Sequence, residues 1–199
     1  PAALRAAITV ANHFSPEVIF NLGDTLDCHE LSRFVKDPTA PSIQEERDRW
    51  ADWAEELNAV CPDLEDKYII MGNHDERFRN AVLAVGGVSD MPENSLDSVL
   101  YTKELGYHSI CDAININGGG NVLYPDAMLY LIHGSIARKH SGSSARAASE
   151  MFVGASTIVG HAHRSAIFTK KTGRGIVKSY EVGTLGTLSP DYMQFTDWS

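Results

Sequence analysis

The chain has 199 residues, of which 43% are hydrophobic and 22% charged, which is enough apolar material for a domain with a buried core. Its 16 glycines follow no period and its 3 cysteines are widely spaced, which excludes collagen-like chains, disulfide scaffolds and thiolate zinc knuckles. A formal net charge of −9 argues against a protein that coats nucleic acid by counterion release.

Hydrophobic periodicity predicts alternating helices and strands in the first half of the chain. In chain order these are a helix ending near Phe14, a strand over 18–22, a helix over 43–60, a strand over 67–71 and a helix over 76–85. Ser42 and Glu45 form a capping box in front of the second helix, where the hydroxyl and the carboxylate satisfy unpaired backbone N–H groups.

The second half is less regular at first and then alternates again. Residues 88–127 suggest only a helix around 96–105 and a glycine turn at 118–120, and no function is assigned to them. Further on we expect strands over 128–132 and 157–159, a helix over 145–153, and a hairpin of residues 166–170 and 175–181. This alternation predicts an α/β fold with mixed strand pairing, in a single domain over residues 1–199.

Side chains that can bind metals follow each of four predicted strands. They are Asp24 after the first strand, Asn73 and His74 after the second, His133 after the third, and His161 and His163 after the fourth. Each alone is weak, because a Gly-Asp pair usually marks a turn and a histidine at a strand end is usually a hydrogen-bonded boundary residue. In open α/β sheets, however, ligands bind beyond the carboxyl ends of the strands. The recurrence at four strand ends therefore favours a functional site.

The residue types indicate a particular kind of metal site. Imidazole nitrogen combined with carboxylate and amide oxygen suits Mn, Fe, Zn, Ni or Co. Two such ions roughly 3.5–4 Å apart can clamp a phosphoryl group and generate hydroxide near neutral pH. Alternate residues of an extended backbone point to opposite faces, so using both His161 and His163 would require two metals or a bend.

Four motifs together resemble the calcineurin-like metallophosphoesterase superfamily. They are Gly23-Asp24-x-x-Asp27, Gly72-Asn73-His74-Asp75, His133-Gly134 and Gly160-His161-x-His163, in this order. The resemblance covers about residues 18–165 and is specific only as a combination. The flanking residues 27–34 and 183–186 are also similar to uncharacterised phage and bacterial members.

The resemblance implies a fold and a role for each matching residue. The implied fold is a four-layer αββα sandwich with two mixed sheets, and the implied cofactors are two divalent transition metals, with Mn expected and Fe, Zn, Ni or Co as alternatives. Asp24 would bridge the two metals, Asn73, His133 and His161 would complete one shell, and His163 would bind the other ion. His74 would contact the phosphate and protonate the leaving oxygen, and Asp27 would orient it.

The chain departs from the family pattern in two places. The first motif, Asp-x-His on the first strand, is absent, and we expect that strand upstream of Pro1 in a longer chain. A true loss would instead favour a catalytically dead metal-binding scaffold module, since surface or capping roles suit His13 and His29 better than ligand replacement. Cys28-His29 also stands where the protein phosphatases of the family carry Arg-Gly, which argues against that activity.

Basic residues are concentrated in the second half of the chain. Residues 134–180 hold 8 bases and one acid, whereas residues 17–66 hold 14 acids and 4 bases. We interpret the acidic stretch as mostly one solvated helix face. Candidate phosphate contacts are Arg77 and Arg164, followed by Arg138 and Arg146, against the alternative that each simply faces solvent.

The prediction is therefore a metal-dependent phosphoesterase acting on phosphodiester or nucleotide-type substrates, with a phosphomonoesterase as the nearest alternative. Nucleotide or nucleic acid is the expected partner. No apolar run approaches the roughly 20 residues of a membrane span, so we expect a cytoplasmic protein without a membrane partner. The sequence leaves the oligomeric state open.

Overall fold

The computed structural model describes residues 2–33, 35–88, 91–110, 121–124 and 128–186. The chain divides into two compact units, which we call the N-terminal unit (residues 5–110) and the C-terminal unit (residues 1–4 and 111–199). The expected glycine turn at 118–120 lies outside the described residues. The single domain expected over residues 1–199 stays a prediction.

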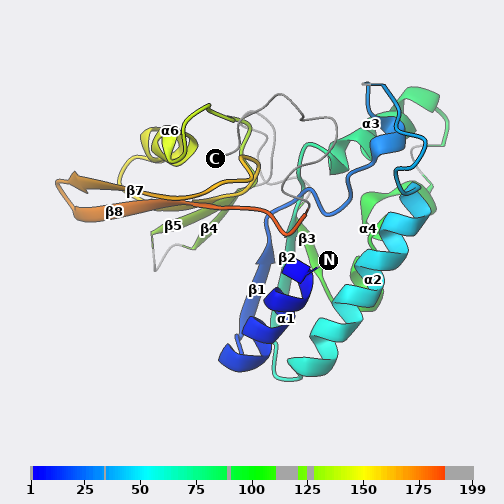
Figure 1. Cartoon of the computed structure of the whole chain (residues 1–199), viewed down its shortest axis with the longest axis horizontal. Coiled ribbons are helices and arrows are strands. Elements are labelled where there is room, and N and C mark those ends of the chain that lie inside the picture. The colour runs from blue at the N-terminus through cyan, green and yellow to red at the C-terminus, as the bar shows by residue number, and fades with distance from the viewer. Residues whose placement is uncertain (1, 34, 89–90, 111–120, 125–127, 187–199) are drawn as a thin grey trace. The chain divides into compact units, whose positions relative to one another are not determined.

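The N-terminal unit contains a parallel sheet. Its elements, with α1 beginning just before the unit, are α1 (Ala2–Phe14), β1 (Val18–Asn21), the 3-10 turn η1 (His29–Leu31), α2 (Ile43–Val60), β2 (Asp66–Ile70), α3 (Asp75–Val85), the 3-10 turn η2 (Pro92–Asn94), α4 (Leu96–Val99), α5 (Thr102–Leu105) and β3 (His108–Ile110). Within the described residues, β2 lies between β1 and β3 and pairs in parallel with both (Figure 1). Parallel pairing brings the carboxyl ends of β1 and β2 together.

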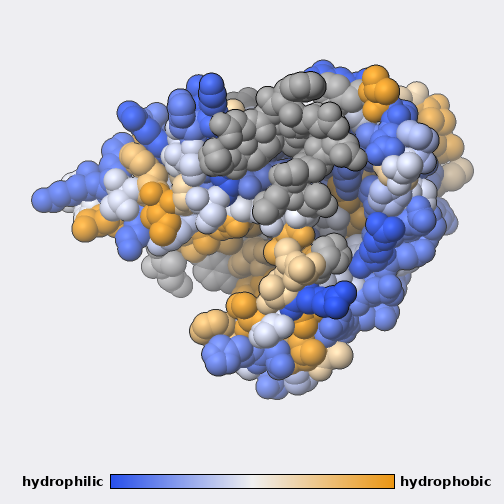
Figure 2. Space-filling view, in the orientation of Figure 1, coloured by the Kyte–Doolittle hydropathy of each residue, from blue (hydrophilic) through white to orange (hydrophobic). Residues whose placement is uncertain are grey.

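Helix α2 spans the predicted residues, and its capping box is confirmed. The Ser42 hydroxyl accepts a hydrogen bond from the Glu45 N–H at 3.2 Å, and the Glu45 carboxylate accepts the Ser42 N–H at 2.7 Å. Trp50, Ala54 and Leu57 form its buried face. Figure 2 shows hydrophilic side chains over much of the surface where Figure 1 places α2. The exposed acids of α2 are five of the 14 acids in residues 17–66, so a solvated helix face explains less of the acidic stretch than predicted.

The single helix predicted around residues 96–105 is wrong. The structure has two short helices, α4 and α5, because Tyr101 between them adopts a left-handed backbone conformation with φ of 50°. The segment just before this break is fixed to α2. The Trp50 indole N–H donates to the Leu100 carbonyl at 2.8 Å, and Arg47 Nε donates to the Val99 carbonyl at 2.9 Å. The buried Trp50 side chain therefore packs between α2 and the segment before Tyr101.

The C-terminal unit contains a mixed sheet. Its elements are β4 (Asn121–Tyr124), β5 (Leu129–Ile132), α6 (Ser143–Met151), β6 (Ser156–Val159), β7 (Ser165–Thr172) and β8 (Gly175–Val182). Within the described residues the strand order is β4-β5-β6-β8-β7. β6 is parallel to β5 and β8, and the two outer pairs are antiparallel, so the predicted mixed pairing and terminal hairpin are both confirmed. Strand β4, like β3, was not predicted from the sequence.

Helix α6 covers one face of this sheet (Figure 1). Ile132 and Val159 of the sheet and Ala148 of α6 form a buried cluster. The rings of Tyr130 and Phe152 pack against it, with their centroids 4.3 Å apart. Throughout the described ranges, every helix is too short or too polar to span a bilayer. The structure therefore shows a mixed α/β protein with two sheets.

Candidate functional site

The loops that follow β1 and β2 are in close backbone contact. Gly23 has φ of 97°, and a Cβ atom on it would lie 2.6 Å from the Gly72 backbone nitrogen. A Cβ atom on Gly72 would collide with the carboxylate and backbone nitrogen of Asp24. Only glycine fits at either position without moving the other loop. The two glycines therefore allow Asp24 to lie directly beside the second loop.

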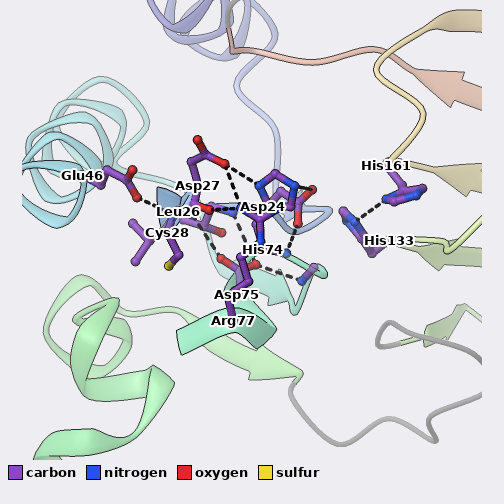
Figure 3. Close-up of polar contacts among 12 residues, drawn as sticks. Asp24, Leu26, Asp27, Cys28, Glu46, His74, Asp75, Arg77, His133 and His161 are labelled. Atoms are coloured by element: carbon purple, nitrogen blue, oxygen red, sulfur yellow. Dashed lines mark hydrogen bonds and ion pairs between the residues drawn. The ribbon is translucent and has the colours of Figure 1, made fainter. Parts of the chain in front are cut away.

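His74 lies between two carboxylates in the N-terminal unit (Figure 3). Its backbone N–H donates to Asp24 Oδ1 at 2.8 Å, and its ring Nε2 lies 4.0 Å from Asp24 Oδ2. Its ring Nδ1 is 2.7 Å from Asp27 Oδ1. The structure thus brings together three of the predicted site residues. Asn73 precedes His74 in the same loop.

Electrostatic interactions favour an ion pair between a protonated His74 and an ionised Asp27. Burial disfavours the imidazolium of His74, but the hydrogen bond to Asp27 and the charge of Asp24 outweigh it and raise the His74 pKa above its usual value. The same hydrogen bond lowers the pKa of Asp27, although burial opposes the shift. The Asp27 carboxylate therefore stabilises the protonated His74 ring.

Asp75, the last residue of the second motif, joins the two loops. Its fully buried carboxyl accepts hydrogen bonds from the backbone N–H groups of Gly72 at 2.9 Å, Leu26 at 3.1 Å and Thr25 at 3.4 Å. Burial, followed by the charge of Asp24, raises the pKa of Asp75 to about 7. No role for Asp75 was predicted from the sequence. Its place in the first turn of a helix, directly after the motif residues, was the available signal.

Two further charged side chains contact the loop that carries Asp27. Glu46 of α2 accepts the Cys28 backbone N–H at 2.9 Å. Arg77 of α3 donates to the Asp27 carbonyl at 2.9 Å and lies 3.4 Å from Asp27 Oδ1. The predicted phosphate contact of Arg77 stays a prediction, and the structure adds this contact with Asp27. Glu46 was missed because nothing distinguishes it from the other acids of α2 in the sequence.

In the C-terminal unit, two histidine rings meet at neighbouring strand ends. His133 follows β5 and His161 follows Gly160 at the end of the parallel strand β6, and the Gly160 N–H donates to the Ile132 carbonyl at 3.2 Å. His161 Nδ1 lies 3.3 Å from His133 Nε2 (Figure 3). His133 is 1% exposed. Two imidazole nitrogens therefore converge inside this unit, as the strand-end argument predicted.

The chain bends sharply after β6. His161 and His163 both have φ of 55°, so neither belongs to an extended strand. This is the bend that the sequence analysis gave as one way of using both histidines. Gly134 opposite has φ of 92°, and a Cβ atom there would lie 2.8 Å from Val159 Cγ1. A side chain at position 134 would push the two strand ends apart.

Left-handed backbone conformations are frequent among the predicted ligands. Asp24, His161 and His163 are three of the seven non-glycine residues with positive φ in the described part of the chain. Such a conformation costs about 1–2 kcal/mol per residue. Strained positions cluster at functional sites, where the surrounding fold stabilises them. The backbone therefore supports a functional role for these residues independently of their chemistry.

The remaining candidates have contacts within their own units. Arg164 donates to the Arg138 carbonyl, and Arg146 pairs with Glu150 at 3.1 Å on an exposed helix face. His29 is buried, so it has no surface role, and its Nε2 accepts the backbone N–H of Asp37 in a loop at 2.9 Å.

Comparisons with known proteins add no family assignment. A scan against protein-family models gives no match, and a search of the curated proteins gives none. The structure defines the chain as a mixed α/β protein with two sheets. What it does is therefore inferred from its own residues and their geometry.

Proposed function

We propose that the chain is a metal-dependent phosphoesterase that hydrolyses phosphodiester or nucleotide-type substrates at a binuclear metal centre. The observation that carries the proposal is His74, whose ring nitrogens face the carboxylates of Asp27 and Asp24 at 2.7 and 4.0 Å. On this proposal His74 is a proton donor, and it lies beside Asp24, whose carboxylate can bind a metal ion. On this proposal the fold is the four-layer αββα sandwich of the calcineurin-like metallophosphoesterases, which the sequence motifs resemble.

The donor set fits divalent transition metals. Two nitrogen ligands on one tetrahedral ion, each at about 2.0–2.1 Å, lie about 3.3–3.4 Å apart. The ring nitrogens of His133 and His161 are 3.3 Å apart. Nitrogen combined with carboxylate and amide oxygen suits Mn, Fe, Zn, Ni or Co. We infer that His133 and His161 share one ion.

The other ligands follow from the sequence motifs. Asn73 would complete the shell of the ion that His133 and His161 share, His163 would bind the second ion, and Asp24 would bridge both. When bound, two such ions supply Lewis-acid stabilisation of phosphoryl oxygens and a nucleophile derived from water. Residues 164–178 add five basic side chains to an otherwise acidic protein, which is consistent with an anionic substrate.

His74 supplies the proton for the leaving group. Because Asp27 accepts the Nδ1 hydrogen, the transferable proton of the imidazolium is the one on Nε2. The hydrogen bond to Asp27 favours the protonated ring. His74 can therefore donate this proton to the departing oxygen while Asp27 stabilises and orients the ring.

The test measures bound metal and turnover on the full-length protein. Metal content per chain is determined by plasma mass spectrometry, and hydrolysis of bis(p-nitrophenyl) phosphate and p-nitrophenyl phosphate is followed in Mn²⁺. Asp24→Asn is compared with Asp52→Asn, a matched change at an exposed acid of α2. We expect two ions per chain and faster diester hydrolysis, with metal content and turnover both lowered only by Asp24→Asn.

Two other outcomes of this test would change the proposed function. Preference for the monoester would replace the diesterase by a phosphomonoesterase. One ion or none with no turnover of either ester would overturn the enzyme and leave a non-catalytic metal-binding module.

A further inference from the structure

We propose that Glu46 and Arg77 are positioning residues that fix Asp27, and through it the His74 ring, from opposite ends of the same peptide segment. The inference rests on the proposed function, since it assigns these residues to the site that His74 serves. Neither residue touches the reacting atoms in this role. Arg77 acts through the carbonyl and side chain of Asp27, and Glu46 through the N–H of Cys28 in the same peptide group.

The geometry places one charged group on each side of the Asp27–Cys28 peptide (Figure 3). Arg77 donates to the Asp27 carbonyl at 2.9 Å and lies 3.4 Å from Asp27 Oδ1. Glu46 accepts the N–H of Cys28, the next residue, at 2.9 Å. Both polar atoms of one peptide group are therefore bonded to charged side chains from two different helices, α2 and α3.

The segment needs such contacts because it is not regular structure. Cys28 has φ of 50°, a left-handed conformation that costs a non-glycine residue about 1–2 kcal/mol. The Asp27 side chain is 41% exposed, so packing alone does not immobilise it. Hydrogen bonds to charged partners are roughly twice as strong as neutral ones. The two contacts can thus maintain a strained segment that carries a half-exposed carboxylate.

Glu46 differs from the other acids of α2 in its surroundings. Glu45, Asp48, Asp52, Glu55 and Glu56 are exposed, whereas Glu46 is half-buried. Burial raises the pKa of its carboxyl, and its Oε1 is buried with no hydrogen-bond partner among the described residues. Placing a carboxyl there is unfavourable by itself. The hydrogen bond that Glu46 accepts from the Cys28 N–H offsets this cost.

A carboxylate held in this way fixes the ring that it contacts. Asp27 Oδ1 is 2.7 Å from His74 Nδ1, and this hydrogen bond orients the His74 ring. A displacement of the segment that carries Asp27 therefore changes the orientation of the ring. Misplacement of a catalytic group by about 1 Å can cost on the order of a hundredfold in rate. Loss of either contact should therefore lower kcat and leave substrate binding nearly unchanged.

The experiment compares conservative and disruptive substitutions. Glu46→Gln keeps an oxygen acceptor for Cys28, and Glu46→Ala removes it. Arg77→Lys keeps one cationic donor, and Arg77→Met removes it. Glu55→Gln and Glu55→Ala on the exposed side of α2 are the matched controls. Each variant is assayed for kcat and KM in Mn²⁺ with a dinucleoside phosphate diester, whose leaving alkoxide needs a proton.

We expect kcat to fall on the order of tenfold to a hundredfold in Glu46→Ala and Arg77→Met. KM should stay within about twofold, and the conservative variants should recover most of the loss. The Glu55 variants should match the parent protein. Should Arg77→Met raise KM and leave kcat unchanged, Arg77 would be a substrate ligand and the proposal would be wrong for it. Equal kcat in Glu46→Ala and the parent would overturn the role of Glu46.

Two readouts do not depend on activity. Cys28 has no exposed surface, and burial raises its pKa to about 12, so alkylation of its thiol reports opening of the segment. The NMR signal of the His74 Nδ1 proton reports the contact with Asp27. We expect faster Cys28 alkylation and loss of the His74 signal in Glu46→Ala, with native far-UV circular dichroism. If no ester is hydrolysed but these signals change as expected, the proposed function fails and the positioning contacts stand.

Discussion

At the scale of single residues, the protonation state of His74 depends on the side chains around it. His74 is a histidine at a strand end, which by itself indicates little. Its contacts with Asp24 and Asp27 raise its pKa, and we propose it as the proton donor of the site. The ring's chemistry therefore follows from two acids in the adjacent loop.

The first prediction concerns this proton. Replacing His74 by Gln removes the donor, and general acid catalysis typically contributes about 10²- to 10⁴-fold. We expect that loss in kcat for an alkyl phosphate ester, whose leaving alkoxide needs a proton, and a much smaller loss for a nitrophenyl ester. His13→Gln, a matched change at an exposed histidine, is the control. Equal losses for both classes of ester would contradict proton donation by His74.

The second prediction concerns the close contact of the two loops. A Cβ atom at Gly72 would collide with Asp24, so Gly72→Ala must move one of the loops. We expect a loss of about 1–3 kcal/mol in the free energy of unfolding and weaker metal binding. Gly173→Ala is the control, because a Cβ atom there has no neighbour within 4 Å. Urea unfolding and Mn²⁺ titration calorimetry measure the two effects, and parent-like values in both would show that the contact is not tight.

At the scale of elements, charged side chains organise the ends of helices and strands. In the C-terminal unit, Glu181 of β8 is 3% exposed and accepts the backbone N–H groups of Gly142 at 3.1 Å and Ala145 at 2.8 Å. These groups belong to the start of α6, which has no cap from its own preceding residue. A strand side chain therefore caps the helix that covers the sheet.

The third prediction tests this cap. Glu181→Ala leaves the Ala145 N–H buried without its acceptor, and an unsatisfied buried donor costs about 1–3 kcal/mol. We expect a loss of that size in the free energy of unfolding by urea, with Glu181→Gln losing less because its amide oxygen can still accept. Lys178→Ala, at an exposed position of the same strand, should be neutral. Parent-like stability of Glu181→Ala would rule out this capping role.

At the scale of the whole molecule, binding of a metal ion affects the stability of the folded chain. An ion that binds only the folded chain stabilises it in proportion to the logarithm of its concentration. Metal binding and the stability of the whole chain are therefore linked.

The fourth prediction follows from this linkage. Mn²⁺ at a hundred times its dissociation constant should add about 2.7 kcal/mol to the free energy of unfolding. Thermal unfolding with and without Mn²⁺ measures the shift, and a chelator should reverse it. His133→Ala should abolish most of the shift, whereas His13→Ala should leave it intact. A shift of equal size in His133→Ala would exclude His133 as a ligand.

Much of the fold could be predicted because short sequence patterns indicate individual helices and strands. The capping box placed α2 at the correct residues, and apolar runs identified β1, β2, β5 and β6. The break at Tyr101 was missed because apolar spacing does not reveal a left-handed residue. Strands β3 and β4 were missed because they are short and stand in a segment without clear periodicity.

The sequence by itself determined the α/β class and the candidate ligands, because strand ends and residue chemistry can both be recognised within a few positions. The tertiary structure decided which side chains support the site. Leu26 and Asp75 are 49 residues apart, and Arg77 and Asp27 are 50 apart, so no local pattern could pair them. It also decided the bend that carries His161 and His163. Such contacts and backbone conformations depend on packing between distant segments, which exists only once the chain has folded.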